Sequence, residues 1–283
     1  MKYYTLILTL LITLSSSADQ EGKISNCSNG NCFSATLTGN LTEKEVQAFL
    51  ASIGTAKVTQ GATQITKIIN DMTASVDRVC SKFVKDNEFQ KWGEFVSQEF
   101  DRGKYSALYA GTPDLLRLCP NFKKMTDDQK DSVFILTTTL QAYFESSCNP
   151  NASFSGAPNG TARGLFQQHE GKEHLYSRGC KAGDSRNPEG SIRCTLSMLD
   201  DIAAKGKNIF THDSHWAVHR PQDRNIKAGF RNNAAISTML ALCKIPSCGA
   251  EPTECTQFIK ETRDNAIALS QGGQRRSGRV ANR

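Results

Sequence analysis

Apolar side chains recur at helical spacing through most of this chain from Thr42 onward, whereas the alternation typical of strands is scarce. The spacing predicts helices over Ile65–Cys80, Ser81–Phe100, Pro113–Leu118 and Thr126–Glu145. Thr42 and Thr126 each open a Thr-x-x-Glu/Gln pattern, which caps the start of a helix. The stretch Phe154–Gln167 is rich in Gly, Ser and Asn, and a small β-hairpin is expected there. The pattern as a whole predicts a mainly α fold.

One stripe of large apolar side chains is expected to lie in the core. Its members recur at i, i+3 and i+4 spacing, and they are Phe89, Trp92, Phe95, Val96 and Phe100. Such a stripe more often packs against other helices than binds a ligand. We therefore assign it to the core rather than to a binding surface.

The helix that begins at Thr126 ends at an acidic residue, Glu145, beside Tyr143 and Phe144. The negative end of the helix dipole and the apolar neighbours both disfavour an ionised carboxylate, so the sequence predicts a raised pKa for Glu145. A carboxyl group with a raised pKa suits general acid catalysis near neutral pH. Glu145 is therefore the candidate catalytic residue.

Short motifs follow one another in order from Glu145, and they are Glu145-Ser146-Ser147, Asn149-Pro150-x-Ala152, Gly156-Ala157 and Gly164-Leu165-Phe166-Gln167. Together they resemble the signature of soluble lytic transglycosylases and goose-type lysozymes. Farther on, Asn187–Ile192 and the apolar residues that follow are similar to the helix that buttresses the catalytic helix in that family.

The resemblance implies a lysozyme-like catalytic domain in which Glu145 protonates the glycosidic oxygen between the amino sugars of peptidoglycan. Its cleft is then expected to be lined by Ser146, Gly164, Phe166 and Gln167. The family usually shows a Tyr-Asn-Ala-Gly box farther on, and the corresponding segment here is His215-Trp216-Ala217-Val218-His219-Arg220-Pro221. His215 and His219 are therefore candidate substrate contacts in place of the tyrosine.

The residues after Gln167 bear on the type of reaction. Goose-type lysozymes place an acid there, and the matching zone includes His169 and Glu170, with Glu173 and Asp184 as further candidates for a second carboxylate. Glycosidases commonly use two carboxylates, whereas the resemblance to lytic transglycosylases implies help from the substrate's own acetamido group. The acids and the missing tyrosine box favour a muramidase that hydrolyses the glycan, and a lytic transglycosylase is the alternative.

The same acids suggest a substrate preference. Removing acetyl groups from the glycan exposes protonated amines, and a carboxylate binds such an amine through a charge-assisted hydrogen bond. The sequence therefore carries the hypothesis that the enzyme acts on partly de-N-acetylated peptidoglycan. A scaffold of this kind that no longer cuts would be a non-catalytic cell-wall-binding module, but the presence of Glu145 argues against that function.

The start of the chain and its cysteines indicate export. Residues 1–18 combine Lys2, the apolar run Leu6–Leu14 and small residues before Asp19, as secretory signals do, and the run is too short for a membrane span. The ten cysteines then indicate disulfides formed in an oxidising compartment. We expect a Cys27–Cys32 loop, a staple of the first half through Cys80 and Cys119, and a bridge from the group Cys148, Cys180 and Cys194 to the group Cys243, Cys248 and Cys255.

Other chemistry is not indicated. His169 and His174 are five residues apart, which puts them on different helix faces, so we expect no metal site and no cofactor. The net charge of +6 fits attraction to an anionic cell wall, and no nucleic-acid-reading motif accompanies it. The predicted protein is a secreted or periplasmic monomer with a signal peptide (1–18), a Cys loop and N-terminal helical extension (19–125), a catalytic domain (126–270) and a disordered basic tail (271–283).

Overall fold

The computed structural model describes residues 22–28, 31–37, 60–71, 74–101, 103–157, 159–221 and 234–277. The chain divides into two compact units, Met1–Thr55 and Ala56–Arg283. In the first unit, β1 (Gly22–Ser28) pairs antiparallel with β2 (Asn31–Leu37), and Cys27 lies opposite Cys32 in that register. The signal segment and the capping pattern at Thr42 lie outside the described residues.

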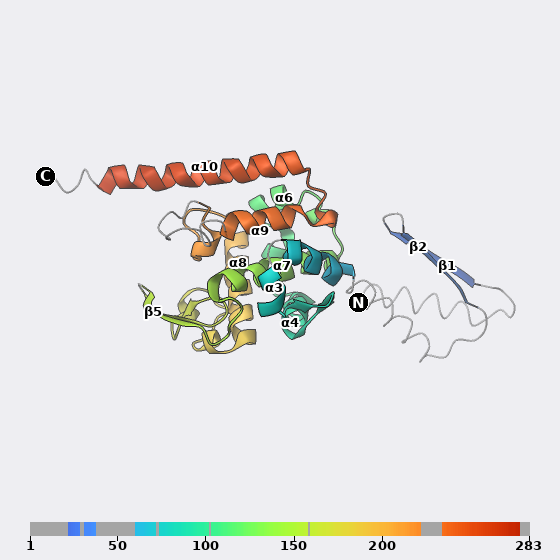
Figure 1. Cartoon of the computed structure of the whole chain (residues 1–283), viewed down its shortest axis with the longest axis horizontal. Helices are drawn as coiled ribbons and strands as arrows, with labels where there is room; N and C mark the ends of the chain where they lie inside the picture. The colour runs from blue at the N-terminus through green and yellow to red at the C-terminus, as the bar shows by residue number, and fades with distance from the viewer. Residues whose placement is uncertain are drawn as a thin grey trace. The chain divides into compact units, whose positions relative to one another are not determined.

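The second unit is mainly helical (Figure 1). Residues 60–71 are helical, and the elements after them are α3 (Ala74–Val79), β3 (Val84–Lys85), β4 (Glu88–Phe89), α4 (Lys91–Asp101), α5 (Ser106–Ala110), α6 (Pro113–Leu118), α7 (Asp127–Ser146), β5 (Ser153–Ala157), β6 (Gly160–Arg163), β7 (Gln168–His169), α8 (Pro188–Ala204), α9 (Ala234–Cys243) and α10 (Pro252–Ser277). Short 3-10 helices are η1 (Phe122–Lys124), η2 (Glu173–Leu175), η3 (Asp184–Arg186), η4 (Ala217–His219) and η6 (Pro246–Cys248). The mainly α fold class with a small antiparallel sheet is thereby confirmed. Within the described ranges, no helix is long and apolar enough to cross a membrane.

Helix α7 lies in the middle of this unit and is buried along most of its length. Its predicted capping box is present, because the Thr126 hydroxyl accepts a hydrogen bond from the Gln129 backbone N–H and the Gln129 side chain accepts one from the Thr126 backbone N–H. Elements α3, α4, α9 and η4 pack on α7. The buried residues Thr137–Thr139 donate their hydroxyl protons to carbonyls one turn earlier, so their polar groups are satisfied inside the core.

The predicted apolar stripe from Phe89 to Phe100 is buried, as expected. The helix that carries it is shorter than predicted, however, since α4 begins only at Lys91. Asp86 and Asn87 both have positive φ and form the two-residue turn of a hairpin between β3 and β4. The helical spacing of apolar residues thus runs past Asp86 and Asn87 without a break. The positive φ of these two polar residues nevertheless makes the segment a hairpin and not a helix.

The Gly-rich stretch after α7 forms the antiparallel sheet β5-β6-β7, which confirms the predicted hairpin and adds a third short strand. Helix α8 begins after Asn187, whose side chain accepts hydrogen bonds from the backbone N–H groups of Glu189 and Gly190. The fully buried Gln168 amide joins the two elements by donating to the Ser191 carbonyl and the Thr195 hydroxyl. The sheet is therefore held against α8.

Disulfides cross-link the second unit, and those among its described residues are Cys80–Cys148, Cys119–Cys248, Cys180–Cys194 and Cys243–Cys255. They bear out the expectation of a disulfide-bonded protein, which fits an oxidising compartment. The predicted bridge from the Cys148 group to the C-terminal cysteines was wrong, since Cys148 pairs with Cys80 and Cys248 pairs with Cys119. The reason is the packing of α3 on α7 and of α6 on α9, which brings cysteines of the first half beside later segments.

The two cross-links from Cys80 and Cys119 also bear on the domain organisation. The structure divides the chain between Thr55 and Ala56, so residues 56–125 belong to the same unit as the predicted catalytic region. One hydrophobic core runs through both parts. Toward the other end of the chain, α10 continues to Ser277, so residues 271–277 of the expected tail are helical.

The length of chain that each disulfide encloses sets an expected order of stability losses. Cys80 and Cys148 are 68 residues apart, whereas Cys243 and Cys255 are 12 apart. Because a longer closed loop removes more entropy from the unfolded chain, the two bridges are expected to contribute about 4 and about 3 kcal/mol. We predict that C80S/C148S lowers the free energy of unfolding by about 1–2 kcal/mol more than C243S/C255S does in denaturant titrations. Equal losses would contradict this order.

Candidate active site

The C-terminal end of α7 carries Glu145 and turns back sharply. Ser147 and Cys148 have left-handed backbone conformations, with φ of 53° and 55°, which residues other than glycine rarely adopt. Their backbone N–H groups donate to the carbonyls of Tyr143 and Ala142 and close the helix end. Glu145 lies in this last turn and is partly exposed. The disulfide from Cys148 to Cys80 holds the turn from the other side.

The segment Gly164–Gln167 lies directly against this helix end. The Ser146 hydroxyl is 2.9 Å from the Leu165 carbonyl oxygen and 3.0 Å from that of Ala142, so it can donate to either. Gln167 also has a left-handed backbone, with φ of 49°, and its side-chain amide donates to the Gly164 carbonyl at 3.0 Å. Two of the sequence motifs, separated along the chain, therefore meet at one place.

Gly164 is required by this arrangement for two reasons. Its φ is 77°, and a Cβ atom built on it would collide with the Ser185 carbonyl oxygen. Any side chain would therefore push the segment away from η3 and disturb the contact with Ser146. The sequence predicts Gly164 as a cleft residue, and the structure shows a steric reason for glycine at this position.

A group of aromatic and imidazole rings lies beyond β7. The His169 Nδ1 atom is 2.5 Å from the Tyr176 hydroxyl, and the His215 ring packs on Tyr176 with centroids 4.6 Å apart. All three side chains are partly exposed. Trp216, next to His215, is buried and donates its indole N–H to the Phe166 carbonyl at 3.0 Å. The ring group is thus attached to the same Gly164–Gln167 segment as the end of α7.

Burial keeps these imidazoles neutral. It lowers the pKa of His215 to about 4, with His169 and Arg220 acting in the same direction, and it lowers the pKa of His219 to about 3, with His215 adding to the effect. Burial and then the Lys172 charge also lower the pKa of His169. At neutral pH these rings are therefore not cations: His169 contacts the Tyr176 hydroxyl, and His215 and His219 pack against neighbouring rings.

The three acids predicted near the cleft are each engaged within the protein. Glu170 forms ion pairs with Arg163, at 2.8 Å, and with Arg186, and the hydrogen bonds from Arg186 and Arg163 lower its pKa. Glu173 is fully buried, and it accepts hydrogen bonds from Ser185 and from the Gly183 backbone. Burial opposes ionisation of Glu173, but these hydrogen bonds outweigh it and lower the pKa. Asp184 is buried as well and accepts from the Lys181 backbone N–H at 2.6 Å.

The structure separates the predicted site residues into two groups. Glu145, Ser146, Gln167, His169 and His215 are partly exposed around the meeting point of α7, the sheet and the ring group.

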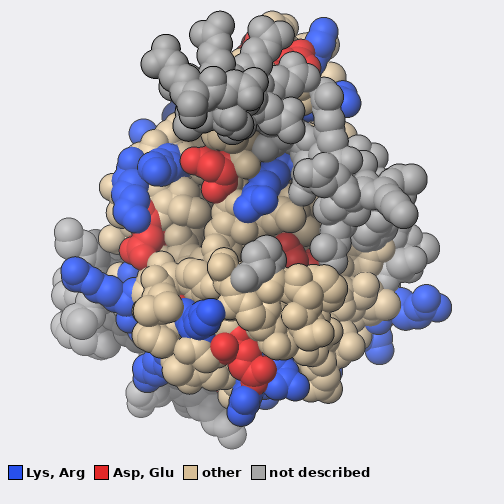
Figure 2. All heavy atoms as spheres, turned by 90° about the vertical axis from the view of Figure 1, so that its left-hand side faces the viewer, with Lys and Arg blue, Asp and Glu red and all other residues tan. Residues whose placement is uncertain are grey.

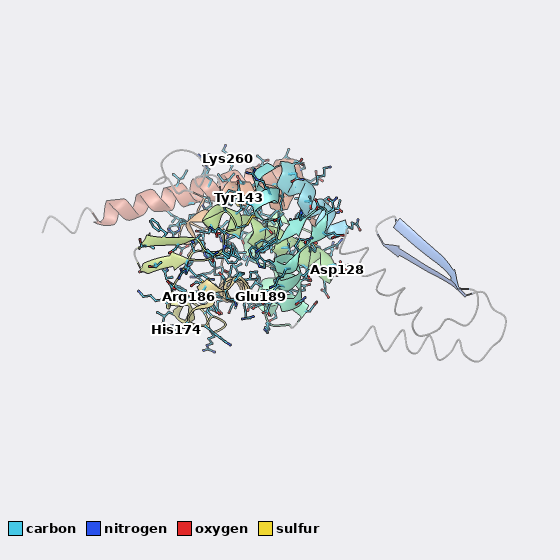
Figure 3. The ribbon with its side chains drawn as sticks, turned by 60° about the horizontal axis from the view of Figure 1, so that its bottom comes forward. Asp128, Tyr143, His174, Arg186, Glu189 and Lys260 are labelled. Carbon is cyan, nitrogen blue, oxygen red and sulfur yellow. A yellow bond between two sulfur atoms is a disulfide. The ribbon has the colours of Figure 1, made fainter. Side chains whose placement is uncertain are left out.

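Gly164, Phe166 and His219 are instead buried. The exposed fractions of Phe166 and His219 are 0% and 1%. Phe166 contributes its carbonyl as the acceptor for Trp216, and the His219 ring packs between those of Phe210 and Trp216. The side chains of Phe166 and His219 therefore pack in the core and do not face solvent. His174 is an exposed residue of η2, and Figure 3 shows it well separated from Tyr143 on α7.

Three residues of this arrangement were missed by sequence reasoning. Gln168 anchors the sheet to α8, Tyr176 faces both His169 and His215, and Trp216 ties the ring group to Phe166. Strand alternation gave no signal for Gln168, because Gln167 before it has a left-handed backbone and lies outside β7. No local pattern marks Tyr176, because its partners come together only in the folded chain.

No protein-family model and no curated protein matches this chain. Among solved structures it is similar to Bd0314 DslA, in wild-type form 2 and in a glutamate-to-glutamine mutant, each with a TM-score of 0.45 and 20% sequence identity, covering 56% of this chain and 90% of that one. A second glutamate-to-glutamine mutant of DslA gives a TM-score of 0.39 and 22% identity, over 54% of this chain and 90% of that one. The likeness therefore extends over about half of this chain.

The buried His219 predicts a pH dependence of stability. Its folded-state pKa of about 3 lies below the ordinary value of 6.5, so its contribution is fully present above about pH 6.5 and is lost as the pH falls toward 3. One such group changes the free energy of unfolding by at most about 1.4 kcal/mol per pH unit. We predict that His219→Phe makes the fall in unfolding free energy between pH 6.5 and pH 4.5 shallower by about 1 kcal/mol per unit. The exposed His174→Gln serves as the control, and an unchanged slope in His219→Phe would contradict the assignment.

Proposed function

We propose that this protein is a secreted glycosidase that cleaves the glycan strands of peptidoglycan, with Glu145 as the general acid. The observation that carries the proposal is the contact of Ser146 with Leu165, 19 residues farther along the chain. It sets the end of the acid-bearing helix against the segment that the sequence resemblance assigns to the same cleft. Export of the protein is supported by its disulfides and by the signal-like first residues.

The surroundings of Glu145 suit this chemistry. The carboxyl group is partly exposed at a rigid helix end, so it can reach a substrate oxygen while its backbone stays fixed. A sugar ring offers hydroxyl groups at its edge and C–H groups on its faces. The neutral His169, Tyr176 and His215 offer the matching hydrogen-bonding atoms and ring surfaces, and Trp216 attaches them to the Gly164–Gln167 segment.

The state of the other acids favours the transglycosylase route as the second candidate function. Hydrolysis with two carboxylates needs a second group that can reach water or substrate. Glu173 and Asp184 are buried and hydrogen-bonded, and Glu170 is held between two arginines. The resemblance to lytic transglycosylases implies a route in which Glu145 alone acts, first as acid and then as base, while the substrate's acetamido group assists. Because these acids are already bound within the protein, they are also less available to the protonated amines of a de-N-acetylated glycan than the sequence suggests.

We predict that Glu145→Gln lowers the rate of glycan release from purified peptidoglycan by about 10²–10⁴-fold, because it removes the transferable proton and keeps the shape of the side chain. The matched control is Glu189→Gln, the same change at the partly exposed start of α8, where Glu189 pairs with the exposed Lys91. Thermal unfolding and cosedimentation with the wall should be unchanged in both variants. More than about a tenth of the activity left in Glu145→Gln would sink the assignment. A native protein that binds the wall without cutting it would indicate the non-catalytic module instead.

The products distinguish the two routes. If the acetamido group assists, digestion of acetylated walls should release anhydromuramyl ends, and walls that have been enzymatically de-N-acetylated should be cut at least about tenfold more slowly. The physical reason is that an amine cannot take the place of the acetamido carbonyl oxygen. Mass spectrometry of the released fragments measures both. Reducing ends from acetylated walls, together with equal or faster cutting of de-N-acetylated walls, would establish hydrolysis. In that case Glu170→Gln tests whether Glu170 contributes to a preference for de-N-acetylated walls.

A further inference from the structure

A hollow of about 690 Å³ lies against α8. Its lining includes Lys104, Tyr105, Arg178, Lys181, Arg193 and Asp200. Helix α8 contributes Arg193, Ser197 and Asp200 to it, whereas Ser191 and Thr195 of the same helix bind Gln168 under the candidate active site. With 3.6 residues per turn, these two sets lie on opposite sides of α8. The hollow therefore lies on the side of α8 away from Gln168 and the candidate active site.

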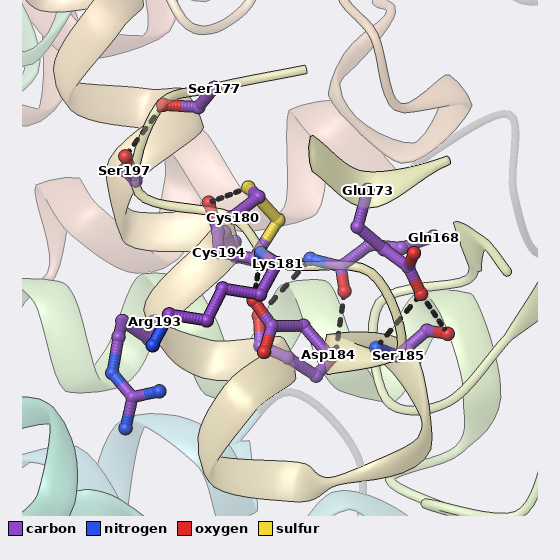
Figure 4. Close-up of a disulfide and its surroundings, with 12 residues drawn as sticks. Gln168, Glu173, Ser177, Cys180, Lys181, Asp184, Ser185, Arg193, Cys194 and Ser197 are labelled. Carbon is purple, nitrogen blue, oxygen red and sulfur yellow. Dashed lines mark hydrogen bonds between the residues drawn. A yellow bond between two sulfur atoms is a disulfide. The ribbon is translucent and has the colours of Figure 1, made fainter. Parts of the chain in front are cut away.

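A disulfide fixes both sides of this hollow (Figure 4). Cys180 stands between Gly179 and Lys181 on the loop, and its partner Cys194 follows Arg193 on α8. The Ser177 and Ser197 hydroxyls, 2.6 Å apart, add a second link between the loop and the helix. The Lys181 and Arg193 side chains, which both line the hollow, thus project from two covalently joined backbones. Preorganisation of this kind reduces the entropy lost when a ligand binds.

The charges of the hollow are predominantly positive and are only partly neutralised. The buried carboxylate of Glu99 lies 3.7 Å from Arg193 Nε and 3.3 Å from Lys104 Nζ, and the Arg193 guanidinium also packs over the Phe95 ring. This contact uses Nε and leaves the two terminal nitrogens of Arg193 available to a ligand. Asp200 is engaged as the acceptor for the Leu108 backbone N–H at 2.7 Å.

The remaining two cations are exposed on the loop. Within the described part of the chain, Arg178 and Lys181 have no carboxylate partner within ion-pair distance. The hollow therefore presents four cations against two carboxylates that are already engaged. By contrast, acidic and basic side chains alternate over the face at the β5 end of the unit (Figure 2).

We propose that this hollow is a binding site for phosphate groups, carried by a phosphodiester polymer attached to the cell wall. A guanidinium whose Nε side faces Glu99 presents its terminal N–H groups in the geometry that phosphate oxygens accept, and the lysines add point charges at the rim. A chain of phosphodiesters can satisfy several of these cations at once, which a single carboxylate cannot do. The choice of the wall as the carrier rests on the proposed function, whereas the phosphate chemistry does not.

Titration of the full-length protein with short-chain inorganic polyphosphate tests the phosphate chemistry. We expect R178Q/K181Q/R193Q to bind at least tenfold more weakly than the native protein, with a salt dependence that is less steep by about one unit for each lost contact. Since Arg193 neutralises the buried Glu99, R178Q/K181Q is the variant to use if the triple variant does not fold. The control K67Q/K123Q/K124Q removes the same charge from exposed positions elsewhere. Equal weakening in the control, or no binding by the native protein, would overturn the proposal.

Cosedimentation with cell walls tests the carrier. With Glu145→Gln as the background, the walls stay intact and the result does not depend on whether the native protein cuts them. We expect a smaller bound fraction on walls stripped of phosphodiester polymers by hydrofluoric acid, and R178Q/K181Q on untreated walls should bind as weakly as its parent does on stripped walls. Equal binding to both walls would overturn the wall assignment. Tighter binding of single-stranded DNA than of polyphosphate with the same number of phosphates, through the same residues, would do so as well.

Discussion

The burial of α7 is the constraint on which the candidate site depends. A helix that begins at a capping box, is covered by α3, α4, α9 and η4 and has its threonine hydroxyls satisfied internally cannot shift along its axis without breaking many contacts. Its last turn therefore has a fixed place in the unit. The buried side chains of α7 therefore also fix the position of the partly exposed Glu145.

Buried polar contacts give the surrounding segments an equally definite place. Gln168 is fully partnered by Ser191 and Thr195, and Glu173 by Ser185 and Gly183, so the sheet and the loop before α8 each have one arrangement that satisfies their polar atoms. The amide of Gln141, one turn before Glu145, is an exception: it is buried and makes no hydrogen bond within the described part of the chain. A buried polar group of this kind costs stability.

The sequence predicted those features of the fold and the candidate site that are determined by residues close together in the chain. The capping box at Thr126, the apolar stripe and the hairpin after α7 are set by neighbours in the chain, and their residue types indicate them. The hairpin turn at Asp86 and Asn87 was missed because a positive φ at two polar residues competes with an apolar period that continues past it. The partners of Cys148 and Tyr176 and the engagement of Glu170 and Glu173 depend on elements far apart in sequence. Only the packing of those elements determines them.

The position of one cross-link bears on when the end of α7 becomes covalently fixed. Cys148 follows Glu145 by three residues, and its bridge to Cys80 joins the turn after the acid to the end of α3. A reducing cytosol keeps such thiols apart, so a newly made chain lacks the covalent tie behind its helix end until it reaches an oxidising compartment. The turn that follows Glu145 is thereby expected to gain its covalent tie to α3 only where the two thiols can be oxidised.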